Sequence, residues 1–227
     1  MIQHPNPVED VVYRSVKIEA GSVRLSGQWD MPERSRSVVL FAHGSGSSRH
    51  SPRNQAVART LQEAGAGTLL FDLLTQEEEV EDELSGHIRF NIPFLTERLI
   101  MATRWLRGQP EAKGLRIGYF GSSTGGAAAL AAAAEEGEIV QAVVSRGGRP
   151  DLAGRALSHV LAPALLIVGE HDEAVLHLNK QAAAQLKCEH KLAIVPGATH
   201  LFEEAGALEE VARLASGWFQ HHLEGVS

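Results

Sequence analysis

Residues 116–136 read RIGYFGSSTGGAAALAAAAEE, and this stretch says more about the fold than any other part of the chain. Its first five residues are mostly apolar and predict a buried strand, and the alanine-rich part from Thr124 to Glu136 predicts a helix. Between them, Gly121-Ser122-Ser123-Thr124-Gly125 fits the pattern Gly-x-Ser-x-Gly in one register only. A strand, this pentapeptide and a helix in succession are typical of a sharp turn that presents one serine side chain above a sheet.

Steric constraints explain the two glycines of the pentapeptide. A chain that turns this sharply forces its central residue into a strained backbone conformation, and side chains two positions before and after would collide. Gly121 and Gly125 remove both collisions, so Ser123 is the candidate nucleophile. The alternative is a plain Gly/Ser turn without chemistry, because short motifs alone are weak evidence.

Further strands and helices are predicted on both sides of this stretch. Continuous apolar runs predict buried strands, and the segments between them carry helical spacing or helix-start signals. Strands that alternate with helices predict an α/β fold with a mostly parallel sheet and helices on both faces, here as one domain over residues 1–227. Alternating residues 11–30 predict an antiparallel N-terminal hairpin with its turn near Ala20-Gly21-Ser22. The predicted strands are 38–42, 68–71, 116–120, 141–144, 164–168 and 191–195, and the predicted helices are 51–64, 88–106, 124–136, 174–186 and 208–222.

The segment Gln76 to Arg89 interrupts this alternation. It holds six acidic residues between Glu77 and Glu83. Such a run favours a solvated loop. Its position directly after a strand leaves a second interpretation open, in which the segment is a flap over the site.

A serine nucleophile needs a base, and the base needs a carboxylate that holds its tautomer. In folds with this serine turn, the order along the chain is serine, acid, histidine. Asp172 follows the strand 164–168 and is the candidate acid, unless it only caps the next helix. Glu170 and Asp151 are the rival acids.

His200 is the candidate base. It follows the last predicted strand within Pro196-Gly197-Ala198-Thr199-His200, and open α/β sheets place their sites at the carboxyl ends of strands. The other downstream histidines fall on predicted helix surfaces or before a strand, where a solvated ring is expected. Ser123, Asp172 and His200 therefore form a predicted catalytic triad.

Negative charge on a carbonyl oxygen under attack needs backbone N–H donors. We expect one from Thr124, at the start of a helix, and one from Ser45 in the small-residue loop after the strand 38–42. Arg53 and Arg146 are candidates for contacts with an anionic substrate group. The alternative is that both arginines are only surface charges.

Composition excludes several other classes of protein. The net charge is −7 and no basic stripe is present, so we expect no nucleic-acid surface. The one cysteine, Cys188, rules out an internal disulfide, and the N-terminus MIQHPNPVED has no secretion signal. No stretch approaches the roughly twenty apolar residues that span a bilayer. These features predict a cytoplasmic protein without a membrane partner.

Four segments together resemble the dienelactone hydrolase family, over about Val38 to His222. They are 43–47 (HGSGS), 121–125 (GSSTG), 169–172 (GEHD) and 196–200 (PGATH). The resemblance implies the α/β-hydrolase fold, with Ser123 as nucleophile, His200 as base and Asp172 as the acid that orients it. Founding members of the family use a cysteine nucleophile, whereas Ser123 stands here.

The resemblance and the serine together predict a hydrolase of a small ester or lactone, acting through an acyl-enzyme on Ser123. No cofactor is needed for this chemistry, and the scattered histidines show no metal-ligand spacing. Two alternatives stay open. One is a ligand-binding module of the same fold without catalysis, and the other is acyl transfer, thioester hydrolysis or peptide cleavage by the same triad. The sequence does not predict an oligomeric state.

Overall fold

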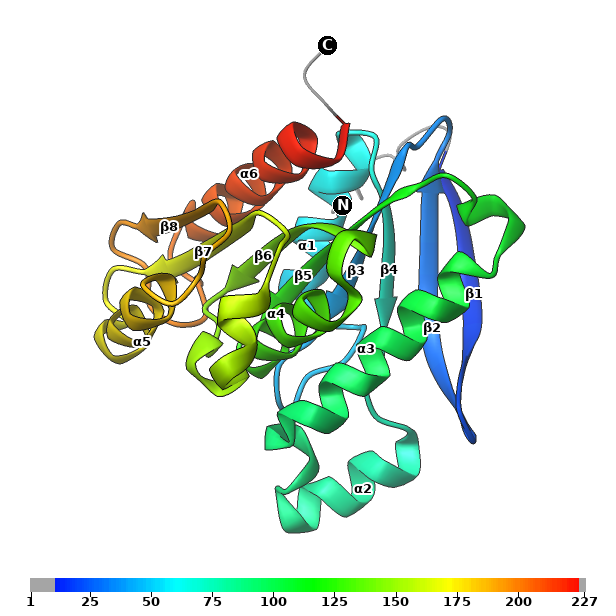
Figure 1. The fold of residues 1–227 in the computed structure, drawn as a ribbon, viewed down its shortest axis with the longest axis horizontal. Coiled ribbons are helices and arrows are strands. Elements are labelled where there is room, and N and C mark those ends of the chain that lie inside the picture. The colour runs from blue at the N-terminus through cyan, green and yellow to red at the C-terminus, as the bar shows by residue number, and fades with distance from the viewer. Residues whose placement is uncertain (1–10, 225–227) are drawn as a thin grey trace, which may run out of the picture.

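The computed structural model describes residues 11–224 and contains one mixed sheet (Figure 1). The ten N-terminal residues, over which the sequence predicts no secretion signal, and residues 225–227 lie outside the described range. Within that range, the strand order is β1-β2-β4-β3-β5-β6-β7-β8. The strands are β1 (Val11–Ala20), β2 (Val23–Pro32), β3 (Ser37–Ala42), β4 (Gly67–Phe71), β5 (Arg116–Ser122), β6 (Val140–Arg146), β7 (Ala164–Gly169) and β8 (His190–Val195).

Strands β3 to β8 run parallel to one another, and β1 and β2 form the predicted antiparallel hairpin at one edge. The hairpin turn lies at Gly21-Ser22, where Gly21 takes a φ of 64° that glycine adopts without steric cost. β2 also pairs antiparallel with β4 and so joins the hairpin to the parallel part. The predicted fold class and hairpin are confirmed.

Helices cover both faces of the sheet because the inner strands are apolar on both sides (Figure 1). Successive residues of β3 show this: Leu40 packs into the core on one face, and Phe41 packs against Phe120 on the other, with ring centroids 4.9 Å apart. The first face carries α3 (Ile92–Arg107), α4 (Thr124–Glu136) and α5 (Glu173–Ala183), and the second carries α1 (Pro52–Glu63) and α6 (Ala207–Phe219). No helix among residues 11–224 is long and apolar enough to cross a membrane.

Besides the longer helices, residues 11–224 contain short 3₁₀ or π segments. One of them, η1, precedes α3 and shifts its start. The predicted helix 88–106 begins only at Ile92, where the side chain of Asn91 accepts the N–H of Phe94 and Pro93 falls in the first turn. The turns are η1 (Ile88–Phe90), η2 (Pro110–Ala112), η3 (Gly137–Ile139), η4 (Pro150–His159) and the π-helical η5 (Gln220–Glu224).

The acidic segment Gln76 to Arg89 is not the solvated loop that its composition favours. Most of it forms helix α2 (Gln76–Ser85), which lies beyond the end of β4 (Figure 1). A capping box starts the helix: Glu78 N–H donates to Thr75 Oγ1 over 3.2 Å, and Thr75 N–H donates to Glu78 Oε2 over 2.8 Å. These two bonds satisfy backbone N–H groups at the start of the helix. They therefore stabilise the helical conformation of this acid-rich segment.

Candidate active site

Ser123 occupies the turn between β5 and α4, with φ 52° and ψ −121°. This strained conformation is possible because neither flanking glycine carries a side chain. A Cβ on Gly121 would collide with the carbonyl of Gly125, and a Cβ on Gly125 would collide with the carbonyl of Ala42. The Ser123 N–H donates to the carbonyl of Arg146 over 3.2 Å, which fixes the turn to the neighbouring strand. The serine side chain is partly exposed at the carboxyl edge of the sheet.

Asp172 and His200 lie at the same edge, after β7 and after β8. His200 Nδ1 is 2.6 Å from Asp172 Oδ2, a distance typical of a charge-assisted hydrogen bond. Asp172 is also the residue before α5, yet its side chain makes no capping bond there. The carboxylate therefore accepts a hydrogen bond from His200 and does not cap the helix.

The two rival acids are engaged elsewhere. Glu170 Oε2 accepts the N–H of Gly197 over 2.8 Å, and Asp151 receives two hydrogen bonds from Arg149. Neither contacts the ring of His200 through a hydrogen bond. Of the three candidate acids, the structure joins only Asp172 to the candidate base.

Gly147 links the serine turn to the histidine loop. It follows Arg146, whose carbonyl accepts the Ser123 N–H. A Cβ built on Gly147 would lie 3.5 Å from Cε1 of His200. Ser123 and His200 thus lie on adjacent loops, although no hydrogen bond joins their side chains within residues 11–224. Such bonds are often long before substrate binds.

The expected oxyanion donors also lie together beside Ser123, the candidate nucleophile. A Cβ on Gly44 would be 3.0 Å from Cβ of Ser123, so the loop after β3 packs directly on the serine turn. In this structure, the Ser45 N–H donates to Thr124 Oγ1 over 3.1 Å. The Thr124 N–H, at the first position of α4, has no intrahelical acceptor. A substrate oxygen would have to replace the threonine hydroxyl at the Ser45 N–H.

His43 holds this loop in place. Its Nδ1 is 2.9 Å from the carbonyl of Gly44, and its Nε2 is 3.0 Å from the backbone nitrogen of Leu73. A carbonyl accepts and an N–H donates, so the ring carries its proton on Nδ1 and is neutral. Burial lowers the pKa of His43, which agrees with a neutral ring. The ring connects the loop after β3 to the segment that leads into α2.

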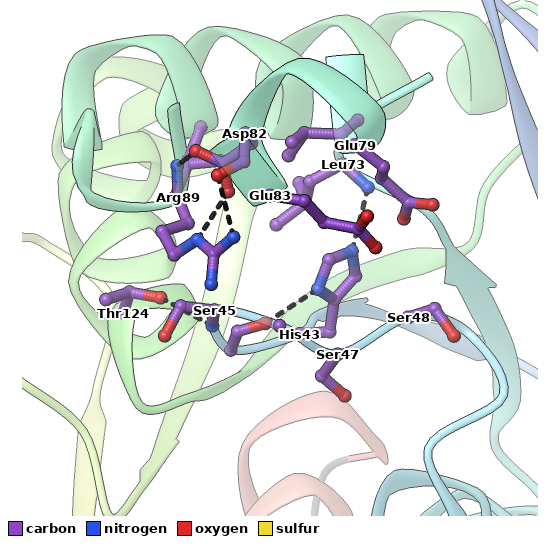
Figure 2. Close-up of a pocket in the computed structure, with 14 residues that line it drawn as sticks. His43, Ser45, Ser47, Ser48, Leu73, Glu79, Asp82, Glu83, Arg89 and Thr124 are labelled. Carbon is purple, nitrogen blue, oxygen red and sulfur yellow. Dashed lines mark hydrogen bonds and ion pairs between the residues drawn. The ribbon is translucent and has the colours of Figure 1, made fainter. Parts of the chain in front are cut away.

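A cavity of about 280 Å³ lies between this loop and α2 (Figure 2). Asp82 and Arg89 form an ion pair on its wall, and Glu79 and Glu83 add two more carboxylates. Burial opposes ionisation of Asp82, but hydrogen bonds from Arg89 and Ile88 outweigh it and lower the pKa of Asp82. Burial, with the nearby charges of Asp72 and Glu83, raises the pKa of Glu79. The lining residues are His43–Ser48, Leu73, Leu74, Glu79, Asp82, Glu83, Arg89, Leu95 and Thr124.

The sequence analysis does not predict the pocket wall that α2 and η1 form. The flap interpretation places the segment Gln76 to Arg89 over the site but assigns no role to Arg89. The signal that could have found the helix is the capping-box pattern Thr75-x-x-Glu78. The cavity includes Ser45 and Thr124, so it opens beside the expected oxyanion donors.

Arg53 and Arg146 do not line this cavity. They lie on the other face of the sheet, beside the loop that follows His200. Arg53 Nη1 is 3.2 Å from Glu203 Oε1, and Cζ of Arg146 is 5.7 Å from the ring centroid of Phe202. Arg146 is only 7% exposed, so the interpretation of both arginines as surface charges is wrong for Arg146.

Among residues 11–224, no three His, Cys, Asp or Glu side chains are grouped so that they could hold a metal ion.

Two known proteins illustrate what this chain is similar to. A crystal structure of a dienelactone hydrolase from Anabaena variabilis is 56% identical, covers 95% of this chain and 100% of its own, and superposes with a TM-score of 0.93. A Mycobacterium tuberculosis protein named "putative phosphoribosyl transferase" is 55% identical over 210 residues, which are 92% of this chain and 46% of that protein. The chain thus spans about half the length of the curated relative.

More distant structures share the fold. Est1E from Butyrivibrio proteoclasticus is 19% identical, covers 91% of this chain and 98% of its own, and has a TM-score of 0.75. The family model described as "Dienelactone hydrolase family" matches residues 30–223, which is most of the chain. The serine turn, the histidine–aspartate pair and this match agree, and the chain belongs to the dienelactone hydrolase family.

Proposed function

We propose that this protein is a serine hydrolase that cleaves a small carboxylic ester or lactone through an acyl-enzyme on Ser123. The observation that carries the proposal is the Asp172–His200 hydrogen bond at the sheet edge where Ser123 occupies a strained turn. The family supports hydrolase chemistry in general. The serine mechanism and the carboxylic ester substrate are what we propose beyond the family.

In the first half-reaction, Asp172 holds His200 with a proton on Nδ1, which leaves Nε2 free to accept the Ser123 proton. The Ser123 oxygen attacks the substrate carbonyl and forms a tetrahedral intermediate. The N–H groups of Thr124 and Ser45 stabilise its negative oxygen. His200 returns the proton to the leaving alcohol oxygen as the ester bond breaks. A lactone would remain attached as an open hydroxyacyl chain.

In the second half-reaction, water replaces the alcohol. His200 takes a proton from the water, which attacks the acyl carbonyl and forms a second tetrahedral intermediate at the same donors. The intermediate collapses, the ester bond to Ser123 breaks, and His200 returns the proton to the serine oxygen. The carboxylic acid leaves and the enzyme is restored.

The cavity beside the oxyanion loop limits what enters on that side. Its wall carries the carboxylates of Glu79, Asp82 and Glu83 but only one arginine, Arg89, which is already paired with Asp82. A negatively charged group would be repelled there. We therefore propose that an uncharged part of a small substrate occupies this cavity.

Labelling with a fluorophosphonate probe tests the proposed nucleophile. We expect wild type to be labelled at Ser123 and to hydrolyse para-nitrophenyl esters, lactones or both, and Ser123→Ala to do neither. Ser122→Ala is a matched control, because Ser122 is a buried neighbour that ends β5. Labelling at another residue, or hydrolysis that survives in Ser123→Ala, would refute the proposal.

The same assay separates the alternatives. Ligand binding without labelling would indicate a non-catalytic module of this fold. Labelling with turnover only on acyl-thioesters or peptides, or only with an added acyl acceptor, would keep the triad and change the substrate. The name of the mycobacterial relative concerns a protein about twice as long, so we do not propose phosphoribosyl transfer for this chain.

A further inference from the structure

Arg146 is a buried cation without an acidic partner among the described residues. It ends β6, and the residue is 7% exposed. Its Nε is buried without a hydrogen-bond partner among the described residues. Within residues 11–224, the interaction described for its side chain is the approach of Cζ to the ring of Phe202. Buried charges in proteins are normally paired, because desolvation without compensation is costly.

A second arginine lies beside the first. Arg53, in the first turn of α1, pairs with Glu203, and Arg146 lies against the adjacent residue Phe202. Burial, together with the charge of Arg53, lowers the pKa of Arg146 to about 10, so Arg146 remains protonated at neutral pH. The Nε of Arg53 is also buried without a partner. The two guanidinium groups thus contact neighbouring residues, Phe202 and Glu203, of the same loop.

The carboxylates nearby do not balance these charges. Glu203 is the only acid in contact with either arginine within the described range, and its side chain is 64% exposed. Exposed ion pairs contribute little. The first turn of α1, which carries Arg53, also presents the positive end of a helix dipole. Two arginines and one glutamate leave a formal excess of one positive charge, and the helix dipole adds to it, so this place favours an anion.

This arginine pair is joined to the candidate catalytic residues. The carbonyl of Arg146 accepts the N–H of Ser123. The next residue, Gly147, lies against both His200 and Phe202, since a Cβ there would be 3.3 Å from the carbonyl of His200 and 3.4 Å from the Phe202 ring. An anion held by the arginines would therefore lie beside the loop that carries the base. It would be on the other face of the sheet from the acid-lined cavity.

We propose that Arg146 and Arg53 bind a phosphate group carried by the substrate, so that the enzyme acts on a phosphorylated ester. The inference rests on the proposed esterase function for its substrate, but the anion site itself does not depend on it. Arginine guanidinium groups match phosphate oxygens in geometry and charge. The uncharged part of the ester then lies toward the acid-lined cavity, and the phosphate lies toward the arginines.

Binding of inorganic phosphate tests the anion site without any catalysis. We expect phosphate to raise the thermal midpoint of wild type more than succinate does at equal ionic strength. Arg146→Gln and Arg53→Gln should each weaken phosphate binding by about 10- to 100-fold. Arg59→Gln is the matched control, because Arg59 is an exposed residue of the same helix without a described ion pair. A phosphate effect that is absent in wild type, equal in all variants or smaller than that of succinate would overturn the proposal.

Kinetics test the substrate. We expect wild type to hydrolyse 2-(phosphonooxy)ethyl acetate with a higher kcat/KM than 2-hydroxyethyl acetate, and the ratio to fall about 10- to 100-fold in the two arginine variants. Arg53→Gln keeps the test valid if the buried Arg146 variant does not fold, because the Arg53 side chain is 34% exposed. A ratio unchanged in Arg53→Gln would overturn the inference. Failure of the esterase proposal is recognised separately, by absent labelling of Ser123.

Discussion

Asp172 Oδ2 lies 2.6 Å from His200 Nδ1, although the two residues follow different strands and are 28 positions apart. The carboxylate is largely buried, with its side chain 13% exposed, whereas the imidazole is 40% exposed. The carboxylate of Asp172 is therefore fixed inside the protein, while the ring of His200 is open to solvent. This arrangement orients the ring, and in the proposed mechanism it leaves Nε2 to receive the proton of Ser123.

Replacing Asp172 by Asn tests this orientation. The amide is nearly the same size but carries no negative charge, and its NH₂ group can favour the wrong histidine tautomer. We expect kcat to fall by up to about 10⁴-fold, with a much smaller change in KM. The measurement is steady-state kinetics on the best ester from the substrate screen.

Glu170→Gln is the control for that experiment. Glu170 lies two residues away and accepts the N–H of Gly197, but it does not contact His200. We expect its kcat to stay within a few-fold of wild type. A loss as large as that of Asp172→Asn would mean that the acid was assigned to the wrong residue.

Gly125→Ala tests the steric basis of the serine turn. The added Cβ would collide with the carbonyl oxygens of Ala42 and His43, which belong to backbone and cannot rotate away. We expect the free energy of unfolding to fall by at least about 2 kcal/mol, and hydrolysis to fall with it. Urea unfolding gives the stability of the variant.

Gly217→Ala is the matched change in an open environment. Gly217 lies in α6, and no atom lies within 4 Å of a Cβ placed there. Alanine is the better helix former, so we expect a gain of about 0.5–1 kcal/mol. If both variants lost stability equally, the close approach at Gly125 would not be the cause.

The serine turn could be predicted because its constraints are local. Gly121, Ser123 and Gly125 lie within five residues, and the flanking strand and helix carry their own periodicity. Asp172 and His200 could be placed by chain order and by their positions after strands. The strand pattern also predicted the sheet, because each buried strand is a short apolar run between turn signals.

The wall of the cavity could not be predicted in the same way. Helix α2 has no apolar face that packs on the core, and its apolar residues Val80 and Leu84 are 57% and 89% exposed. Periodicity therefore gave no signal, and only the capping box at Thr75 marked the helix. Arg89 reaches the cavity because Asp82 holds it from the preceding helix. The pairing of Arg146 with the loop of Phe202 likewise depends on how distant segments pack.

Asp82→Ala tests whether α2 and η1 form a fixed wall. Asp82 accepts the backbone N–H groups of Ile88 and Arg89 and pairs with the Arg89 guanidinium. Without the carboxylate, these donors lose their acceptor and the connection should loosen. We expect faster tryptic cleavage after Arg89 and a higher KM, since one wall of the cavity is no longer held.

Glu81→Ala controls for the removal of one acid from the same helix. Glu81 is exposed and makes no hydrogen bond within the described residues through its side chain. We expect its rate of cleavage after Arg89 to match wild type. If cleavage after Arg89 were equally faster in both variants, the charge of the helix, and not the Asp82–Arg89 contact, would control the protease sensitivity of this segment.

His43→Gln tests the pH dependence that the buried ring imposes on stability. Burial lowers the pKa of His43 in the folded protein, whereas in the unfolded chain it is near 6.5. Below that pH the unfolded chain binds a proton at residue 43 that the folded protein does not. Stability from His43 is therefore present above about pH 7 and is lost as the pH falls, by at most about 1.4 kcal/mol per pH unit.

The variant lacks this titration, so the comparison isolates it. We expect wild type to exceed His43→Gln in free energy of unfolding at pH 8, and the excess to shrink steadily towards pH 5. Urea unfolding at pH 8, 7, 6 and 5 gives the difference, and His87→Gln shows the effect of removing an exposed ring. An excess that stayed constant with pH, or grew towards acid, would mean that His43 is not held neutral between Gly44 and Leu73. The hydrogen bonds that fix the oxyanion loop to the base of α2 would then need a different protonation state.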